Sequence, residues 1–262
     1  MEFDLFQIDA FTDKIFSGNP ACVVPLKEWL PDDLLLKITK ENAVAETAFF
    51  VGKGSGFHLR WFTPEVEMDL CGHATLAAAH AIKEILKWKN DRIIFETQSG
   101  ELQVKVENSK YTLDFPSRNP EPTKMPQLLS QSLNIQPKEV LKARDFVLVY
   151  ANEEEVRNIQ INRLEFDQLE LGTGGVIVTS AGKKFDFVSR FFTPRASVFE
   201  DPVTGSAHCS LIPYWSDKLG KETMTASQLS ERGGTLFCQN LRDRVLISGE
   251  AKTFSIGKFS ID

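Results

Sequence analysis

Glu46 is the clearest candidate for proton-transfer chemistry in this sequence. It stands in the run Ala43-Val44-Ala45-Glu46-Thr47-Ala48-Phe49-Phe50, whose other members are small or apolar. A carboxylate is rarely buried in such surroundings without a partner. A carboxyl group held in a pocket can take a proton and return it, as a general acid/base must. An outward-facing strand residue fits the same pattern equally well, so the run alone leaves both interpretations open.

Two glycines stand where helices are expected to begin. Gly72 lies in Asp69-Leu70-Cys71-Gly72-His73-Ala74-Thr75, and Gly205 lies in Glu200-Asp201-Pro202-Val203-Thr204-Gly205-Ser206-Ala207-His208. Unpaired N–H groups and the positive dipole end at a helix N-terminus attract anions, and glycine lets an anion approach the backbone closely. Two such ends facing each other would hold a small carboxylate, or the enolate-like anion of a deprotonated carbon acid. Taken singly, each glycine is more simply a tight-turn residue, but their repetition favours a shared site.

Polar residues beside these glycines are further candidates. His73 and Ser206 directly follow Gly72 and Gly205 and occupy matching positions, and Asp201 lies four residues before Gly205. A positive helix end would favour the ionised form of Asp201. All three are equally consistent with helix capping or with a satisfied core residue.

An internal repeat indicates that two related halves position these residues. Arg60-Trp61-Phe62-Thr63-Pro64 reappears as Arg190-Phe191-Phe192-Thr193-Pro194, about half the chain later. We therefore predict an N-terminal lobe over 1–116, a linker over 117–127 in the proline-rich stretch, and a C-terminal lobe over 128–262. Return of the last strand to the N-terminal lobe is kept open.

Each half is expected to run strand, turn, helix. The first helix, His73–Lys87, is apolar almost all round and should be buried with a sheet wrapped around it. The second, Ser206–Leu219, should be kinked by Pro213 and stopped by Gly220. The predicted class is α+β, with mainly antiparallel sheet in both halves. The strand candidates are Phe3–Phe11, Cys22–Val24, Thr47–Val51, Phe57–Phe62, Arg92–Glu96, Leu102–Val106, Phe146–Tyr150, Val176–Thr179, Phe185–Phe192 and Val245–Ile247.

Other kinds of site receive little support. The cysteines Cys22, Cys71, Cys209 and Cys238 form no C-x-x-C pair, and the histidines His58, His73, His80 and His208 lack H-E-x-x-H spacing, so we expect no metal and no disulfide framework. Gly172-Thr173-Gly174-Gly175 fits neither nucleotide-binding fingerprint. Cys71 as a nucleophile with His73 is a weaker alternative, because their local spacing cannot establish a dyad.

Bulk composition fits a folded globular protein. The 262 residues are 42% hydrophobic, and 36 acidic against 30 basic residues give a net charge of −6 with both signs mixed. A nucleic acid or an anionic membrane is therefore not expected as the main partner. The sequence contains no run of about 18 apolar residues and does not start like a signal peptide, so a cytoplasmic location is expected.

Taken together, these motifs resemble those of the PhzF-like family, named for an isomerase of phenazine biosynthesis. The resemblance runs from end to end of the chain. The motifs that carry it are Asp9-Ala10-Phe11, Gly18-Asn19-Pro20, Glu46-Thr47-Ala48-Phe49, the two repeated segments, the two glycine segments described above, and Gln228 with Arg232-Gly233-Gly234. It implies the diaminopimelate epimerase-like fold: two pseudo-symmetric lobes, each a curved antiparallel sheet wrapped around a central helix, with the active site in the cleft between them.

The resemblance also implies a homodimer, no cofactor and no metal, with Glu46 shuttling the proton and His73, Asp201 and Ser206 completing the site. The related epimerase uses two cysteines, but the second lobe here carries Asp201 where a thiol would be expected. One departure is Ala45, where the family often has serine.

The function expected from the sequence is a cofactor-independent isomerase or epimerase of a small carboxylate-bearing metabolite. Glu46, His73, Asp201 and Ser206 are the predicted catalytic residues, and Gly72, Thr204 and Gly205 the predicted substrate-binding residues. One alternative is a non-catalytic member that binds a metabolite or a protein. A second is a two-base amino-acid racemase that uses Cys71.

Overall fold

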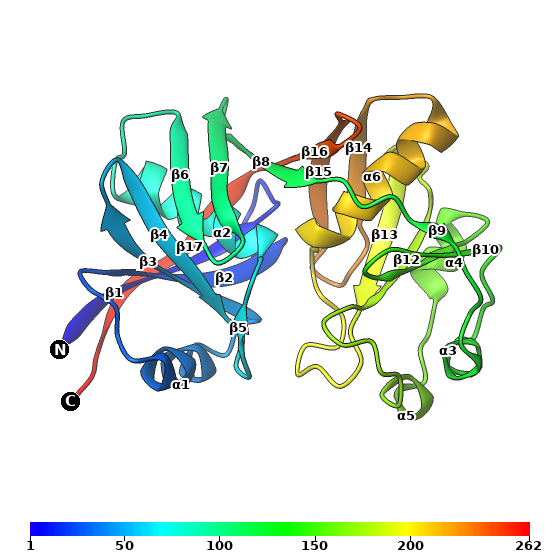
Figure 1. The fold of residues 1–262 in the computed structure, drawn as a ribbon, viewed down its shortest axis with the longest axis horizontal. Helices are drawn as coiled ribbons and strands as arrows, with labels where there is room; N and C mark the ends of the chain where they lie inside the picture. Colours follow the sequence, from blue (N-terminus) through cyan, green and yellow to red (C-terminus); the bar gives the residue numbers. More distant parts are fainter. The chain divides into compact units, whose positions relative to one another are not determined.

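A computed structural model describes residues 1–262, which form two compact units (Figure 1). Unit 1 contains Met1–Asp114 and Ser248–Asp262, and unit 2 contains Phe115–Ile247. Residues 117–127, expected as a linker, are therefore part of unit 2, and the C-terminal segment is part of unit 1. None of the helices is both long and apolar enough to cross a bilayer.

Hydrogen bonds explain why the expected linker belongs to unit 2 and why the last strand returns to unit 1, as the prediction had kept open. The Arg118 N–H donates to the Cys209 carbonyl, and β9 (Glu121–Pro122) pairs with β10 (Glu139–Lys142), so this proline-rich stretch is built into unit 2. The last strand, β17 (Ala251–Ser260), pairs antiparallel with β1 (Glu2–Ala10) along the whole length of β1.

Unit 1 is a mixed sheet with one long buried helix. Its strands beside β1 and β17 are β2 (Asn19–Leu26), β3 (Glu46–Lys53), β4 (Gly56–Phe62), β5 (Glu67–Met68), β6 (Arg92–Thr97), β7 (Gly100–Glu107) and most of β8 (Lys110–Pro116). The pairs β2–β3 and β4–β6 are parallel and the others are antiparallel. Parallel neighbours need a crossover connection. Helix α1 (Asp32–Asn42) supplies the first crossover, and the α2 segment supplies the second.

Helix α2 (Gly72–His80) is the centre of unit 1 and contacts β1, β2, β3 and β17. Every one of its residues is buried. It continues as a π-helical turn over Ala81–Ile85, so the helix expected over 73–87 is confirmed with a change of hydrogen-bonding pattern in its second half. An all-round apolar sequence predicts this burial, because no face of such a helix can be left in water.

Unit 2 is also a mixed sheet with a buried helix, but its strands are connected differently. Its strands beside β9 and β10 are β11 (Phe146–Val149), β12 (Val176–Ala181), β13 (Phe187–Phe192), β14 (Thr223–Gln228), β15 (Gly234–Asn240) and most of β16 (Arg244–Gly249). The pairs β11–β12 and β13–β14 are parallel. Helix α6 (Gly205–Leu219) contacts β14 and β15, continues through Pro213, and ends at Gly220 in the left-handed conformation. The other helices are α3 (Gln127–Ser132), α4 (Glu153–Asn158) and α5 (Arg163–Phe166).

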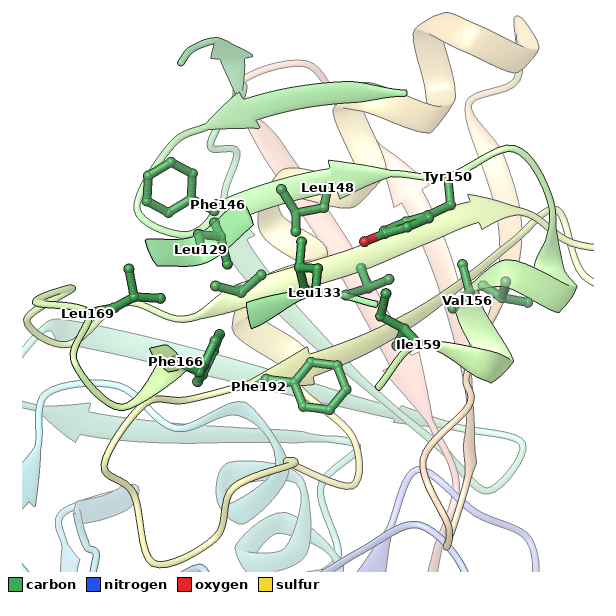
Figure 2. Close-up of a cluster of buried hydrophobic side chains, with 13 residues drawn as sticks. Leu129, Leu133, Phe146, Leu148, Tyr150, Val156, Ile159, Phe166, Leu169 and Phe192 are labelled. Carbon is green, nitrogen blue, oxygen red and sulfur yellow. The ribbon is translucent and has the colours of Figure 1, made fainter. Parts of the chain in front are cut away.

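A buried apolar cluster holds these short helices against the sheet of unit 2 (Figure 2). Leu129 of α3, Val156 of α4 and Phe166 of α5 pack with Leu148 and Phe192 of β11 and β13. All five side chains are at most 2% exposed, so each helix is anchored by its apolar face.

The repeated segments play the same structural role in each unit. The Arg60 Nε donates to Glu67 Oε1 at 2.7 Å, and the guanidinium lies 5.0 Å from the centre of the Phe62 ring. The Arg190 Nε donates to Glu200 Oε1, also at 2.7 Å, and its guanidinium lies 4.9 Å from the centre of the Phe192 ring. The repeat found in the sequence therefore marks two copies of one packing arrangement.

Candidate active site

The start of β3 and the start of α2 bring Glu46 and His73 together in unit 1. Glu46 is the first residue of β3. His73 is the second residue of α2, because this helix begins at Gly72, one residue earlier than predicted. The two side chains are 17% and 5% exposed, and His73 Nε2 lies 3.1 Å from Glu46 Oε2. This is ion-pair distance, although the alignment falls short of a good hydrogen bond. The interpretation of Glu46 as an outward-facing strand residue is therefore wrong.

Cys71 lies on the other side of the same imidazole ring. Its Sγ is 3.7 Å from His73 Nδ1, so each ring nitrogen faces an acidic group. Burial raises the pKa of the Cys71 thiol above its ordinary value. Burial, the largest effect on His73, lowers the pKa of its ring, but Cys71 and Glu46 together raise that pKa well above its ordinary value of 6.5. A protonated ring donates from both nitrogens, which fits an acidic group on each side of it.

In unit 2, a buried glutamine shapes the loop before α6. Thr204 is the residue before the helix, and its hydroxyl donates a short hydrogen bond to Asp201 Oδ2. Its backbone N–H donates to Gln228 Oε1 at 2.9 Å, while Gln228 Nε2 donates to the Asp201 carbonyl at 2.7 Å and to the Thr204 hydroxyl at 3.2 Å. Gln228 is fully buried at the end of β14. It therefore sets the path of the loop that carries Asp201 and Thr204.

Ser206 has a partner that the sequence analysis did not identify. The Arg144 Nη2 donates to Ser206 Oγ at 3.0 Å, and the same guanidinium is bound to the carboxylate of Asp145. The signal for this pair in the sequence was Arg144-Asp145 itself, two charged residues directly before the apolar strand β11.

The two glycines are the first residues of their helices, as the anion-binding interpretation requires. Neither Gly72 nor Gly205 has a positive φ, so a tight turn does not explain the choice of glycine at these positions. A side chain there would stand beside the free N–H groups of the first helical turn. We therefore retain both glycines as candidate substrate-binding residues.

One group of side chains in the chain has the composition of a metal site. Single ligand atoms of Glu46, Cys71 and His73 lie within 4.8 Å of one another, and a thiolate, an imidazole and a carboxylate are ligands that Zn²⁺ accepts. Metal binding would require the buried Cys71 thiol to lose its proton against its raised pKa. We therefore derive no step through a metal, and metal independence stays a prediction that activity in the presence of a chelator tests.

Comparisons with known proteins identify the family of the chain. A family model described as phenazine biosynthesis-like protein matches residues 8–257. A protein of Pseudomonas aeruginosa named as an uncharacterized isomerase is 46% identical over 258 residues, covering 98% of both chains. A crystal structure of a PhzF family protein from Enterococcus faecalis superposes with a TM-score of 0.95 at 42% identity, covering 100% of both chains.

The fold extends to more distant enzymes. A hydroxyproline epimerase from Agrobacterium vitis superposes with a TM-score of 0.63 at 10% identity, covering 100% of this chain and 93% of its own, which shows a shared fold alone. The end-to-end match of motifs, sequence and structure shows that this chain belongs to the PhzF (phenazine biosynthesis-like) family of isomerase-like proteins.

Proposed function

We propose that the chain is an isomerase that moves a proton on a small carboxylate-bearing metabolite without a cofactor, with Glu46 as the general acid/base. The observation that carries the proposal is the buried contact between Glu46 and His73 at the N-terminus of α2. A largely buried carboxylate beside an imidazole ring at the N-terminus of a helix is suited to remove a proton from carbon.

The proposed reaction has two steps. Glu46 takes a proton from a carbon next to the substrate carboxylate, and the negative charge that develops is stabilised by the N–H groups that begin α2 and by His73. Glu46 then returns the proton to another carbon, which gives an isomer, or to the other face, which gives an epimer. Ser206 at the start of α6, and Thr204 and Asp201 in the loop before it, are proposed as further residues of the functional site. The homodimer and the cytoplasmic location stay predictions.

A two-thiol racemase is less well supported. Burial raises the pKa of the Cys71 thiol, whereas a thiol that removes protons from carbon works as the thiolate. In addition, the family resemblance implies Asp201 at the position where a second thiol would be expected.

A deuterium-exchange screen tests the proposal. The protein is incubated in heavy water with a panel of small amino, hydroxy and unsaturated carboxylic acids, and deuterium incorporation is measured by mass spectrometry. We expect exchange with the wild-type protein and at least a 10²-fold loss in the Glu46→Gln variant, which removes the base but keeps the shape of the side chain. Binding of the exchanging acid should persist in that variant.

Two controls make the result specific. Glu67→Gln changes a glutamate that is similarly buried, at 19% exposed, but bound to Arg60, and it should keep exchange. Cys71→Ala should also keep exchange, whereas a racemase that uses Cys71 would lose it. Full exchange activity in Glu46→Gln would refute the assignment of the acid/base.

A further inference from the structure

A guanidinium group that the proposed chemistry does not use lies at the start of α6. Arg144 Nη2 donates to Ser206 Oγ at 3.0 Å. Because a guanidinium can only donate hydrogen bonds, the serine oxygen is the acceptor in this contact. The hydroxyl hydrogen of Ser206 is therefore left to donate to another group. An anionic substrate group is the natural acceptor at a helix N-terminus.

The guanidinium is held rigidly by a buried carboxylate. Asp145 accepts from Arg144 Nε at 3.1 Å and from Nη2 at 2.9 Å, and its side chain is 0% exposed, whereas that of Arg144 is 28% exposed. Removing a carboxylate from water is costly, and a buried ion pair seldom repays this cost in stability. Stability alone is therefore a weak reason for the pair. Arg144 Nη1 takes no part in these bonds and adds a further donor at the partly exposed end of the side chain.

The glycine-rich loop Gly172–Gly175 helps to hold Asp145, and through it Arg144, in place. The Gly175 N–H donates to Asp145 Oδ1 at 2.8 Å. A Cβ atom at Gly175 would lie 2.4 Å from Phe191 Cζ, and one at Gly174 would lie 2.8 Å from the Arg144 carbonyl oxygen. Only glycines let the loop close over Asp145 in this way. The sequence analysis excluded this loop as a nucleotide site, and the structure assigns it to holding the Arg144-Asp145 pair.

The strand registers show that unit 1 has a carboxylate where unit 2 has no side chain. In unit 1, Thr47 is paired with Phe62, and in unit 2, Val176 is paired with Phe192, the corresponding residue of the repeat. The residue preceding Thr47 is Glu46, whereas the residue preceding Val176 is Gly175. The side-chain group that contacts the second helical residue therefore differs in charge between the two units, a carboxylate in unit 1 and a guanidinium in unit 2.

We propose that Arg144 is a positioning residue that holds the Ser206 hydroxyl as a hydrogen-bond donor toward the anionic group of the substrate. The inference rests on the proposed function for its substrate class, a small carboxylic acid, and adds a residue that orients a substrate-binding hydroxyl group.

Kinetics with an acid that exchanges deuterium provide the first test. Arg144→Gln should raise KM at least tenfold with a smaller change in kcat, and Arg144→Lys, which keeps the charge, should recover part of the loss. Arg157→Gln is the matched control, because Arg157 is another arginine of unit 2 in an ion pair, with Glu153, and lies outside the site. Equal KM values for wild type and Arg144→Gln would overturn the proposal. A structural defect would lower the melting temperature of Arg144→Gln and would not be rescued by lysine.

A binding experiment that needs no turnover separates this proposal from the proposed function. The full-length ¹⁵N-labelled protein is titrated with malonate and, separately, with its neutral analogue malonamide. Malonate should shift the Gly205 and Ser206 amide signals, at least tenfold more weakly in Arg144→Gln, while malonamide should not shift them. If malonate fails to shift these signals in wild type, or binds both proteins equally, the role of Arg144 is overturned. If malonate behaves as expected but no acid exchanges deuterium, the isomerase proposal fails and the role of Arg144 in anion binding stands.

Discussion

One imidazole ring in unit 1 lies between two acidic side chains. His73 faces Glu46 with Nε2 and Cys71 with Nδ1. The first contact keeps a positive charge beside the proposed base. It joins residues 27 positions apart in the sequence, so the ring and the carboxylate depend on tertiary structure for their effect on each other.

We predict that Glu46→Gln lowers the pKa of His73. Burial, the largest effect, lowers this pKa, and the acidic neighbours raise it, so loss of the carboxylate leaves burial less opposed. The ring signals of His73 in a two-dimensional NMR pH titration measure the change. Glu67→Gln is again the matched control and should leave the titration where it is in wild type. An unchanged His73 titration in Glu46→Gln would show that the carboxylate does not act on the ring.

The contact between Glu46 and His73 also makes the stability of the protein depend on pH. Because the folded-state pKa of His73 is raised, its contribution to the free energy of unfolding is fully present below pH 6.5 and is lost as pH rises through the folded-state pKa. The stability advantage of wild type over Glu46→Gln should therefore shrink as pH rises above 6.5.

At the scale of elements, helices α2 and α6 were predicted because the sequence of each segment by itself indicated a helix. The burial of α2 and the end of α6 at Gly220 followed from local sequence. The mainly antiparallel sheet was predicted correctly, but helix α1 was not recognised as the crossover between the parallel strands β2 and β3. The strands β10, β14, β15 and β17 were also missed. Strand β17 pairs with the distant strand β1, whereas β10 pairs with the next strand β11, and β14 and β15 pair with each other.

The loop before β12 should tolerate no side chain at Gly175. A Cβ atom there would lie 2.4 Å from the Phe191 ring and 2.8 Å from the Phe192 carbonyl oxygen, so Gly175→Ala should cost about 1–3 kcal/mol, as overpacking typically does. Urea unfolding followed by circular dichroism measures this cost. The control is Gly52→Ala in β3, where a Cβ atom would meet nothing within 4 Å and stability should change little. Equal midpoints for wild type and Gly175→Ala would contradict the close packing of this loop.

At the scale of the whole molecule, each unit contains a buried histidine that must stay neutral. His80 of unit 1 contacts the Tyr111 hydroxyl and the Thr253 hydroxyl of the last strand, and His208 of unit 2 contacts the Thr204 carbonyl oxygen, at 2.8–2.9 Å. Burial lowers the pKa of each ring to about 4. Both units are therefore sensitive to acid through the same physical effect.

We predict that the protein loses stability as pH falls from 6.5 toward 4. In this range the unfolded chain binds protons at both histidines while the folded chain does not, so each ring costs on the order of 3 kcal/mol by pH 4. Urea unfolding at pH 7 and pH 4.5 measures the loss. His80→Gln removes one titrating group but keeps hydrogen-bonding capacity, and should reduce the difference between the two pH values. An unchanged difference would show that His80 does not contribute.

The sequence by itself determined the features that lie within short segments. The repeated arginine motif, the glycine starts of two helices, the buried character of α2 and the family motifs are local patterns, and each is found in the structure or the comparisons. Tertiary structure alone decided which side chains meet: Glu46 with His73, Arg144 with Ser206, and the last strand with the first. The physical reason is that these contacts join positions 27 to about 258 residues apart, so the local propensity of a segment does not encode them. They form only when sheet pairing and burial bring the distant segments together.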